Sequence, residues 1–393
     1  MSRSLSELLS TLVAIPSVNP MGGEADLDIC FEGRMSDWLC DFFQYLGVPW
    51  ERVQVSPGRD NVFGLYDSGS SCTLLMDAHQ DTVPVAGMTV LPFTADIQGD
   101  RMYGRGTCDV KGGMASMLWA FERLVRERPA GAPRVVMSCT CDEEATTLGI
   151  SHLVNSWSSG GHRFCEKRPD VSVIAEPTLL DVVVAHKGVR RFEIECSGRA
   201  CHSSDPSQGI SAIYRMGSVL SRLEEYARVL PSRVASHPLC GSAALSVGII
   251  RGGSSVNIVP DHCSIEIDRR VVPGEDRSLI IPEIQQCLAD LDFEVTFGEP
   301  WVDSPPLTDE DNSTLASRLL ECVAAVESPH RAIGVPFGTH ASRTCAAGVP
   351  SVVFGPGSID QAHTKDEYIE LPQLEVAGET LFRVCSDASR LMD

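Results

Sequence analysis

The stretch TLLMDAHQD, residues 73–81, runs from an apolar tetrapeptide into His79 and Asp81. Its first residues are typical of a strand that is buried on both faces. The arrangement recurs along the chain, where other short apolar runs are followed by a histidine or a carboxylate. In an open α/β sheet, the loops beyond the carboxyl ends of the strands converge on one crevice. The pattern therefore predicts an α/β fold with a polar cluster at one edge of its sheet.

Five residues of this cluster are potential metal ligands. Four of them come after apolar runs: His79 after 73–76, Glu144 after 134–137, Glu176 after 171–174 and His363 after 351–354. The fifth, Asp109, stands where a glycine-rich segment meets a predicted helix over 113–125. Mixed histidine and carboxylate ligation with an open position is typical of hydrolytic zinc sites. The set indicates a two-zinc hydrolase, and a mononuclear zinc enzyme stays open because its ligands would be almost the same.

The length of 393 residues exceeds the roughly 250–300 residues at which one hydrophobic core stops growing, so we expect two domains. Alternating strand and helix patterns predict a catalytic domain over 1–187 and 299–393, with helices on both faces of its sheet. The insertion at 188–298 has the order β-α-β-β-α-β of a ferredoxin-like unit. Its predicted strands are 191–196, 244–250, 263–271 and 293–296, and its predicted helices are 210–229 and 278–291.

Composition limits the partners and the compartment. The 32 basic and 53 acidic residues give a net charge of −21, which opposes binding to nucleic acid or to anionic membranes. No stretch has the ~20 consecutive apolar residues of a membrane span. The 15 cysteines are an odd number, are spread singly and follow no secretory signal. We therefore expect reduced thiols and a cytoplasmic protein.

Two further carboxylates indicate the chemistry. Alternate residues of a strand point the same way, so Asp81 can support the imidazole of His79. The acidic residues 142–144 follow one apolar run, where their mutual repulsion calls for cations. Glu144 can coordinate zinc while Glu143 takes the proton from the activated water. Taken singly, the same residues are also typical of a solvated acidic turn, and Asp109 of a helix cap.

Several segments resemble, in order, those of the dinuclear zinc deacylase and exopeptidase family that includes acetylornithine deacetylase, succinyl-diaminopimelate desuccinylase and bacterial glutamate carboxypeptidase. They are AHQDTVP (78–84), GRGTCDVKGG (104–113), DEE (142–144), EP (176–177) and AHT (362–364). The resemblance spans nearly the whole chain. It implies a zinc-peptidase-like catalytic domain with a mixed sheet flanked by helices, and an inserted ferredoxin-like dimerisation or lid domain.

The resemblance also implies a role for each residue of the cluster. His79 and Glu176 would hold one zinc ion, Glu144 and His363 would hold the other, and Asp109 would bridge the two. Glu143 would be the general base, Asp81 would support His79, and the peptide bond after Asp109 would be cis. Two zinc ions per subunit are expected, with cobalt or manganese as substitutes at such N/O sites.

The insertion carries further segments that resemble the family's substrate contacts, namely 198–204, 257–260 and 268–274. By this resemblance His202 would reach the partner subunit's active site and stabilise the oxyanion, so a homodimer would be part of the mechanism. Arg270 would bind the substrate carboxylate, and Asn257 would also contact the substrate. Outside the family context, an interfacial histidine and a surface arginine are the simpler interpretations.

One segment departs from the family. In FGTHAS (337–342), His340 stands where relatives often carry an acidic residue, and the desuccinylases have a Ser/Gly-rich segment that ends in Asp-Gly. His340 is predicted to contact the substrate side chain or to lie near the metal. The missing Ser/Gly segment favours an N-acetyl amino acid such as N-acetylornithine, and hence arginine biosynthesis, over succinyl-diaminopimelate.

Two other functions stay open at this point. A carboxypeptidase or dipeptidase would use the same metals and would differ only in the shape of its pocket. A non-catalytic relative would bind N-acyl amino acids or serve as a dimeric scaffold. Such proteins usually lose the base or a ligand. Because Glu143, Asp81 and all five ligands are present, the sequence favours an enzyme that acts on small N-acyl amino acids or dipeptides.

Overall fold

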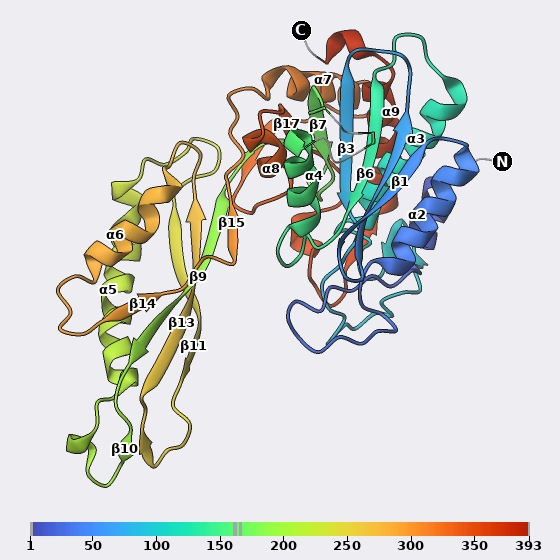
Figure 1. Ribbon diagram of the computed structural model, residues 1–393. Coiled ribbons are helices and arrows are strands. Elements are labelled where there is room, and N and C mark those ends of the chain that lie inside the picture. Colours follow the sequence, from blue (N-terminus) through green and yellow to red (C-terminus); the bar gives the residue numbers. More distant parts are fainter. Residues whose placement is uncertain (1–2, 160–162, 165–166, 392–393) are drawn as a thin grey trace. The chain divides into compact units, whose positions relative to one another are not determined.

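The computed structural model describes residues 3–159, 163–164 and 167–391, which form two compact units (Figure 1). Unit 1 comprises Met1–Val184, Thr308–Gly334 and Thr339–Asp393, and unit 2 comprises Ala185–Leu307 and Val335–Gly338. Unit 2 extends beyond the predicted insertion at 188–298. The reason is that β15 (Val302–Ser304) pairs with β9 (Gly188–Ser197), which keeps the chain on the sheet of unit 2 past residue 298.

A mixed sheet of eight strands lies at the centre of unit 1, in the order β1-β2-β6-β3-β7-β17-β8-β16. The four strands β6, β3, β7 and β17 are parallel, whereas β1, β2 and β8 pair antiparallel with their neighbours. The strands are β1 (Trp50–Ser56), β2 (Arg59–Tyr66), β3 (Thr73–His79), β6 (Arg134–Thr140), β7 (Val171–Ile174), β8 (Val182–His186), β16 (Ala332–Val335) and β17 (Ser351–Val353). This sheet confirms the predicted fold class.

Helices cover both faces of the sheet (Figure 1). One face carries α1 (Leu5–Val13), α2 (Gly33–Leu46), α3 (Lys111–Glu127), α7 (Ser313–Ala324) and α9 (Leu371–Cys385), and the other carries α4 (Leu148–Ser159) and α8 (Ala341–Ala346). Successive side chains of a strand point to opposite faces of the sheet, so each strand contributes to the packing on both faces. Leu74 and Met76 of β3 join the large core with the first group, whereas Leu75 between them packs with α4. No helix of the described residues is long and apolar enough to cross a bilayer.

A second, smaller sheet of unit 1 has the order β18-β5-β4 and is antiparallel. Its strands are β4 (Asp96–Gln98), β5 (Arg101–Tyr103) and β18 (Tyr368–Glu370). Ile369 lies opposite Met102, and both are fully buried. This pairing brings the glycine-rich segment 104–113 next to the chain that follows His363.

Unit 2 has its own sheet and its own core. Besides β9 and β15 it contains β10 (Cys201–His202), α5 (Ala212–Arg233), β11 (Ala244–Gly252), β12 (Ile258–Val259), β13 (His262–Val271), α6 (Ile280–Cys287) and β14 (Val295–Phe297). The order β11-β13-β9-β14 is that of a ferredoxin-like sheet, with α5 packed on it through Met216 and Tyr226. Helix α6 ends before the predicted residue 291, where the weak helix formers Asp290 and Asp292 follow.

Gly64 of β2 allows α2 to lie close to the sheet. A Cβ at Gly64 would overlap the ring of Phe43, which is fully buried. We expect Gly64→Ala to lower the free energy of unfolding by about 1–3 kcal/mol through overpacking, measured by urea denaturation. Gly33→Ala is the matched control at the first residue of α2, because nothing lies within 4 Å of its added Cβ. Equal stability of the two variants would contradict this account of the packing.

Candidate metal centre

Four of the five predicted ligands lie at one edge of the unit 1 sheet. His79 is the last residue of β3, Glu144 follows β6, and Glu176 follows β7. His363 comes after β17 and the turns that succeed it. Because β3, β6, β7 and β17 are parallel neighbours, their carboxyl ends share that edge. The fold thus gathers side chains that are far apart in the sequence.

Asp109 lies between the two histidines. Its Oδ1 is 3.1 Å from His79 Nε2, and its Oδ2 is 3.3 Å from His363 Nε2. His363 Nε2 is also 3.1 Å from Glu144 Oε2. Ligand atoms of His79, Asp109 and Glu144 all lie within 4.8 Å of one another. Since each oxygen of Asp109 faces a different histidine, the arrangement suits a carboxylate that bridges two cations. The peptide bond between Asp109 and Val110 is cis, as the resemblance implies.

The pKa values of the carboxylates in the cluster indicate that it can bind cations. Burial, reinforced by neighbouring carboxylates, raises the pKa of Glu143 to about 8, that of Glu144 to about 7, and that of Glu176 well above its ordinary value. Burial would also raise the pKa of Asp109, but hydrogen bonds from His363 and His79 outweigh it and lower that pKa. So many buried carboxylates ionise together only where cations compensate them.

The donor set fits divalent metal ions. It combines two imidazoles with three carboxylates, the mixture that zinc accepts in hydrolytic sites. Glu144 Oε1 is buried and has no hydrogen-bond partner among the described residues, as expected of an oxygen reserved for a cation. His79, Asp109 and Glu176 are buried, whereas the side chain of His363 is 54% exposed. The cluster is therefore open to solvent on the side of His363.

Asp81 orders two neighbouring segments of the site. Its carboxylate accepts hydrogen bonds from the backbone N–H groups of Glu143 at 3.0 Å and Glu144 at 3.2 Å. His79 Nδ1 donates instead to the backbone carbonyl of Asp81 at 2.9 Å, while the nearest carboxylate oxygen is 3.7 Å away. The carbonyl thus orients the imidazole with Nε2 towards Asp109, and the carboxylate of Asp81 positions the predicted base and its neighbouring ligand.

The third member of the acidic run, Asp142, has a structural role. It accepts hydrogen bonds from Asn19 at 2.9 Å and pairs with Arg59 at 3.1 Å. Asn19 also donates to Asp81 at 2.8 Å, so one amide links the two carboxylates. Sequence reasoning missed Asn19 and Arg59, because neither stands near a strand end that carries a ligand.

His340 is buried beside the centre, with only 1% of its surface exposed. Its Nδ1 lies 2.8 Å from Asp77 Oδ2, and its ring centroid is 6.4 Å from that of His79. Asp77 also accepts hydrogen bonds from Ser138 at 2.7 Å and Thr140 at 3.1 Å. The Nε2 atom of His340 is buried without a hydrogen-bond partner in the described part of the chain. Its contact with a substrate stays a prediction.

The remaining predicted residues belong to unit 2. His202 is the last residue of β10 and pairs with Ile258 of β12, and Asn257 directly precedes β12. Ser203 N donates to Asn257 O at 3.0 Å, so the two predicted residues belong to neighbouring segments. Both side chains are exposed. Arg270 on β13 is held by Asp268 through hydrogen bonds of 2.6 and 3.2 Å. The roles of these three residues towards a substrate stay predictions.

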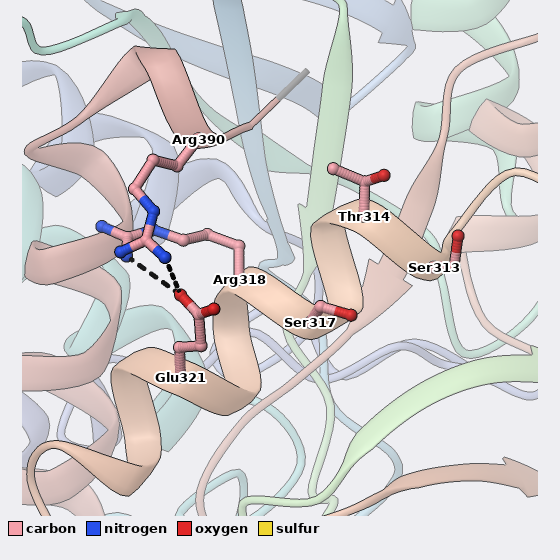
Figure 2. Close-up of a pocket in the computed structure, with 6 residues that line it drawn as sticks. All are labelled: Ser313, Thr314, Ser317, Arg318, Glu321 and Arg390. Carbon is pink, nitrogen blue, oxygen red and sulfur yellow. Dashed lines mark hydrogen bonds and ion pairs between the residues drawn. The ribbon is translucent and has the colours of Figure 1, made fainter. Parts of the chain in front are cut away.

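A surface hollow of about 330 Å³ on α7 belongs to a different part of unit 1 (Figure 2). It is lined by Ser313, Thr314, Ser317, Arg318, Glu321 and Arg390. Glu321 pairs there with Arg390 at 2.5 Å and with Arg318 at 3.6 Å. Because none of the five predicted ligands lines this hollow, it is separate from the metal centre.

Comparison with known proteins identifies the family. The family model "Peptidase family M20/M25/M40" matches residues 75–387. The chain belongs to this family. It is 30% identical to an acetylornithine deacetylase of Pectobacterium atrosepticum over 398 residues, which cover 96% of this chain and 97% of that protein. It is 29% identical to an acetylornithine deacetylase of Vibrio campbellii over 369 residues, covering 90% and 92%.

Solved structures support the same fold. An M20 family metallo-carboxypeptidase of Sulfolobus solfataricus superposes with a TM-score of 0.77 at 18% identity, covering 98% of this chain and 99% of that one. A dinuclear metal-binding M20 peptidase of Bacillus subtilis gives a TM-score of 0.68 at 16% identity, covering 97% and 96%. With the family match and the donor set, the chain is a metallohydrolase that acts on amide bonds.

We expect the pair of His340 and Asp77 to stabilise the edge of the sheet that carries the ligands. His340→Ala leaves the buried Asp77 carboxylate with hydroxyl partners alone, so the free energy of unfolding should fall by about 1–3 kcal/mol. The measurement is urea denaturation of the metal-free protein. His262→Ala is the control, since His262 is exposed and its nearest acidic oxygen is 3.7 Å away. A loss no larger than that of the control would show that the pair is not stabilising.

Proposed function

We propose that this chain is a zinc-dependent deacetylase that removes the acetyl group from N-acetyl amino acids, with N-acetylornithine preferred. The proposed substrate rests on the similarity to proteins named acetylornithine deacetylase. One of them is 30% identical to this chain over 96% of its length. The full donor set and Glu143 support catalysis rather than binding alone. Arginine biosynthesis is the corresponding pathway. The free thiols of the described cysteines support a cytoplasmic location.

Zinc at this centre would supply Lewis acidity, which activates water and polarises the amide carbonyl. His79 and Glu176 would hold one ion, Glu144 and His363 the other, and Asp109 both. Glu143 would carry out the proton transfers of the reaction. Its backbone is held by Asp81, and its carboxyl group interacts with those of Glu144 and Asp109. From this position it accepts the proton of the attacking water and returns it to the leaving amine.

We further propose that the active form is a homodimer in which His202 of one subunit serves the partner's site. The family resemblance and the exposure of His202 at the end of unit 2 support this proposal. The β11 strand is an unpaired edge of its sheet among the described residues, and Ile249 and Ile250 on it are 40% and 54% exposed. Arg270 would bind the carboxylate of the substrate, Asn257 would contact it nearby, and His340 would face its side chain.

The substrate is tested by kcat/KM of the zinc-loaded protein for N-acetylornithine, N-succinyl-diaminopimelate, N-acetylmethionine and a simple dipeptide. We expect N-acetylornithine to be preferred, and Glu143→Ala to lower kcat by about 10²–10⁴-fold because a general base is lost. Glu24→Ala, which removes an exposed acid, is the matched control. Preference for the dipeptide would indicate a peptidase, and no hydrolysis of any member would indicate a binding protein.

The role of His202 is tested by mixing two inactive variants, Glu143→Ala and His202→Ala, under conditions that exchange subunits. If His202 acts on the partner's site, a mixed dimer contains one site with an intact Glu143 and an intact His202. Activity should then rise above that of either variant alone. If the mixture forms mixed dimers, shown by tagged subunits, and stays as inactive as its components, His202 does not act across the dimer.

A further inference from the structure

Glu367 lies directly beside the segment that carries Asp109, although it is far away in the sequence. The antiparallel pairing of β18 with β5 sets Tyr368 opposite Tyr103. The next backbone contact is the hydrogen bond from Gly104 N to Glu367 O, at 3.1 Å. The side chain of Glu367 therefore enters the turn formed by residues 104–109, and the residue is 0% exposed.

The carboxylate of Glu367 receives four hydrogen bonds from this turn. Its Oε2 accepts from Arg105 Nη1 at 2.6 Å and from Gly106 N at 3.0 Å. Its Oε1 accepts from Cys108 N at 2.9 Å and from Asp109 N at 3.1 Å. Each oxygen is thus occupied by two donors, and one of these donors is the backbone of Asp109 itself.

Within the turn, Thr107 donates to Gly104 O from its backbone N–H at 3.3 Å and from its hydroxyl at 2.8 Å, but the N–H groups of Gly106, Cys108 and Asp109 bond to Glu367 instead. Gly106 adopts φ +81°, and a Cβ at that position would stand 2.8 Å from Thr82 Cγ2. Three backbone N–H groups of the turn point inwards to one acceptor instead of into a helix or a strand. Backbone N–H groups that are buried need such an acceptor, because an unpaired one costs free energy. Without Glu367 the turn would have to rearrange.

The same short segment also carries His363, so Glu367 links two of the five ligands. Glu367 follows His363 by four residues, and the N–H group of Asp109 donates to Glu367 at 3.1 Å. Asp109 Oδ2 and His363 Nε2, the ligand atoms on the two linked segments, are 3.3 Å apart. Groups that orient metal ligands typically change metal affinity by about 10–100-fold when they are removed.

We propose that Glu367 is a positioning residue of the metal centre: it fixes the direction of the Asp109 carboxylate and its distance from His363. Glu367 does not touch the metal in this role, and it acts only through the turn that it organises. The inference rests on the metal centre and not on the identity of the substrate.

The test is metal affinity of the Glu367→Gln variant. Glutamine keeps the size of the side chain but sets an amide NH₂ against two of the four donors. We expect Zn²⁺ to bind about 10–100-fold more weakly, measured by competition with a chromophoric chelator on protein freed of metal. The visible spectrum of the Co²⁺-loaded variant should change as well, because it reports the geometry of the ligands.

Glu275→Gln is the matched control. The side chain of Glu275 is only 8% exposed, it pairs with the buried Arg269, and its carboxylate accepts a hydrogen bond from the backbone N–H of Val272 at 3.1 Å. It belongs to unit 2, whereas all five ligands belong to unit 1. This control should lose stability without any change in Zn²⁺ affinity. Equal weakening in both variants would overturn the proposal, since a general loss of stability would then explain it.

A folded Glu367→Gln variant that binds Zn²⁺ within twofold of the original protein would also overturn it. If this variant does not fold, Glu367→Asp replaces it, because the shorter side chain keeps the charge but cannot reach all four donors; the same two criteria apply. The measurements contain no substrate. Preference for a dipeptide over N-acetylornithine would therefore change the proposed function and leave this result untouched.

Discussion

The carboxylate of Asp109 is the group on which the site depends, because it faces both histidines at once. Its two oxygens lie 3.1 Å from His79 and 3.3 Å from His363. A carboxylate that serves two partners must be fixed in position and in rotation. The surroundings of Asp109 meet this need with a glycine-rich turn on one side and the start of α3 on the other. The parallel strands then bring Glu144 and Glu176 to the same place.

A second layer of polar residues supports the sheet from the side of α8. Asp77 accepts hydrogen bonds from Ser138 and Thr140 and lies 2.8 Å from His340 Nδ1. Further along the same face, Ser172 donates to Ser351 at 2.7 Å. Buried polar networks of this kind are stable only when nearly every group has a partner. The Nε2 atom of His340 is the exception, since it has no hydrogen-bond partner among the residues that the structure describes.

The predicted ligands are recognisable in the sequence from their immediate neighbours, and their metal binding stays a prediction. His79 and Glu176, for example, follow apolar runs that are strands in the structure. The structure brings Asp109 to 3.1 Å from His79 and 3.3 Å from His363. The supporting groups could not be predicted in the same way. The carboxylate of Asp81 binds the chain after β6, and Glu367 binds the turn before α3. Both contacts depend on which segments become neighbours in space, and Glu367 resembles the exposed Asp366 beside it in every local respect.

Unit 1 is assembled from three separate stretches of chain, and the last of them contributes His363. On the ribosome, His79, Asp109, Glu144 and Glu176 are therefore made long before their final partner. The whole of the predicted insertion is synthesised between Glu176 and His363. Metal binding by all five predicted ligands therefore waits until the last of the three stretches has been made.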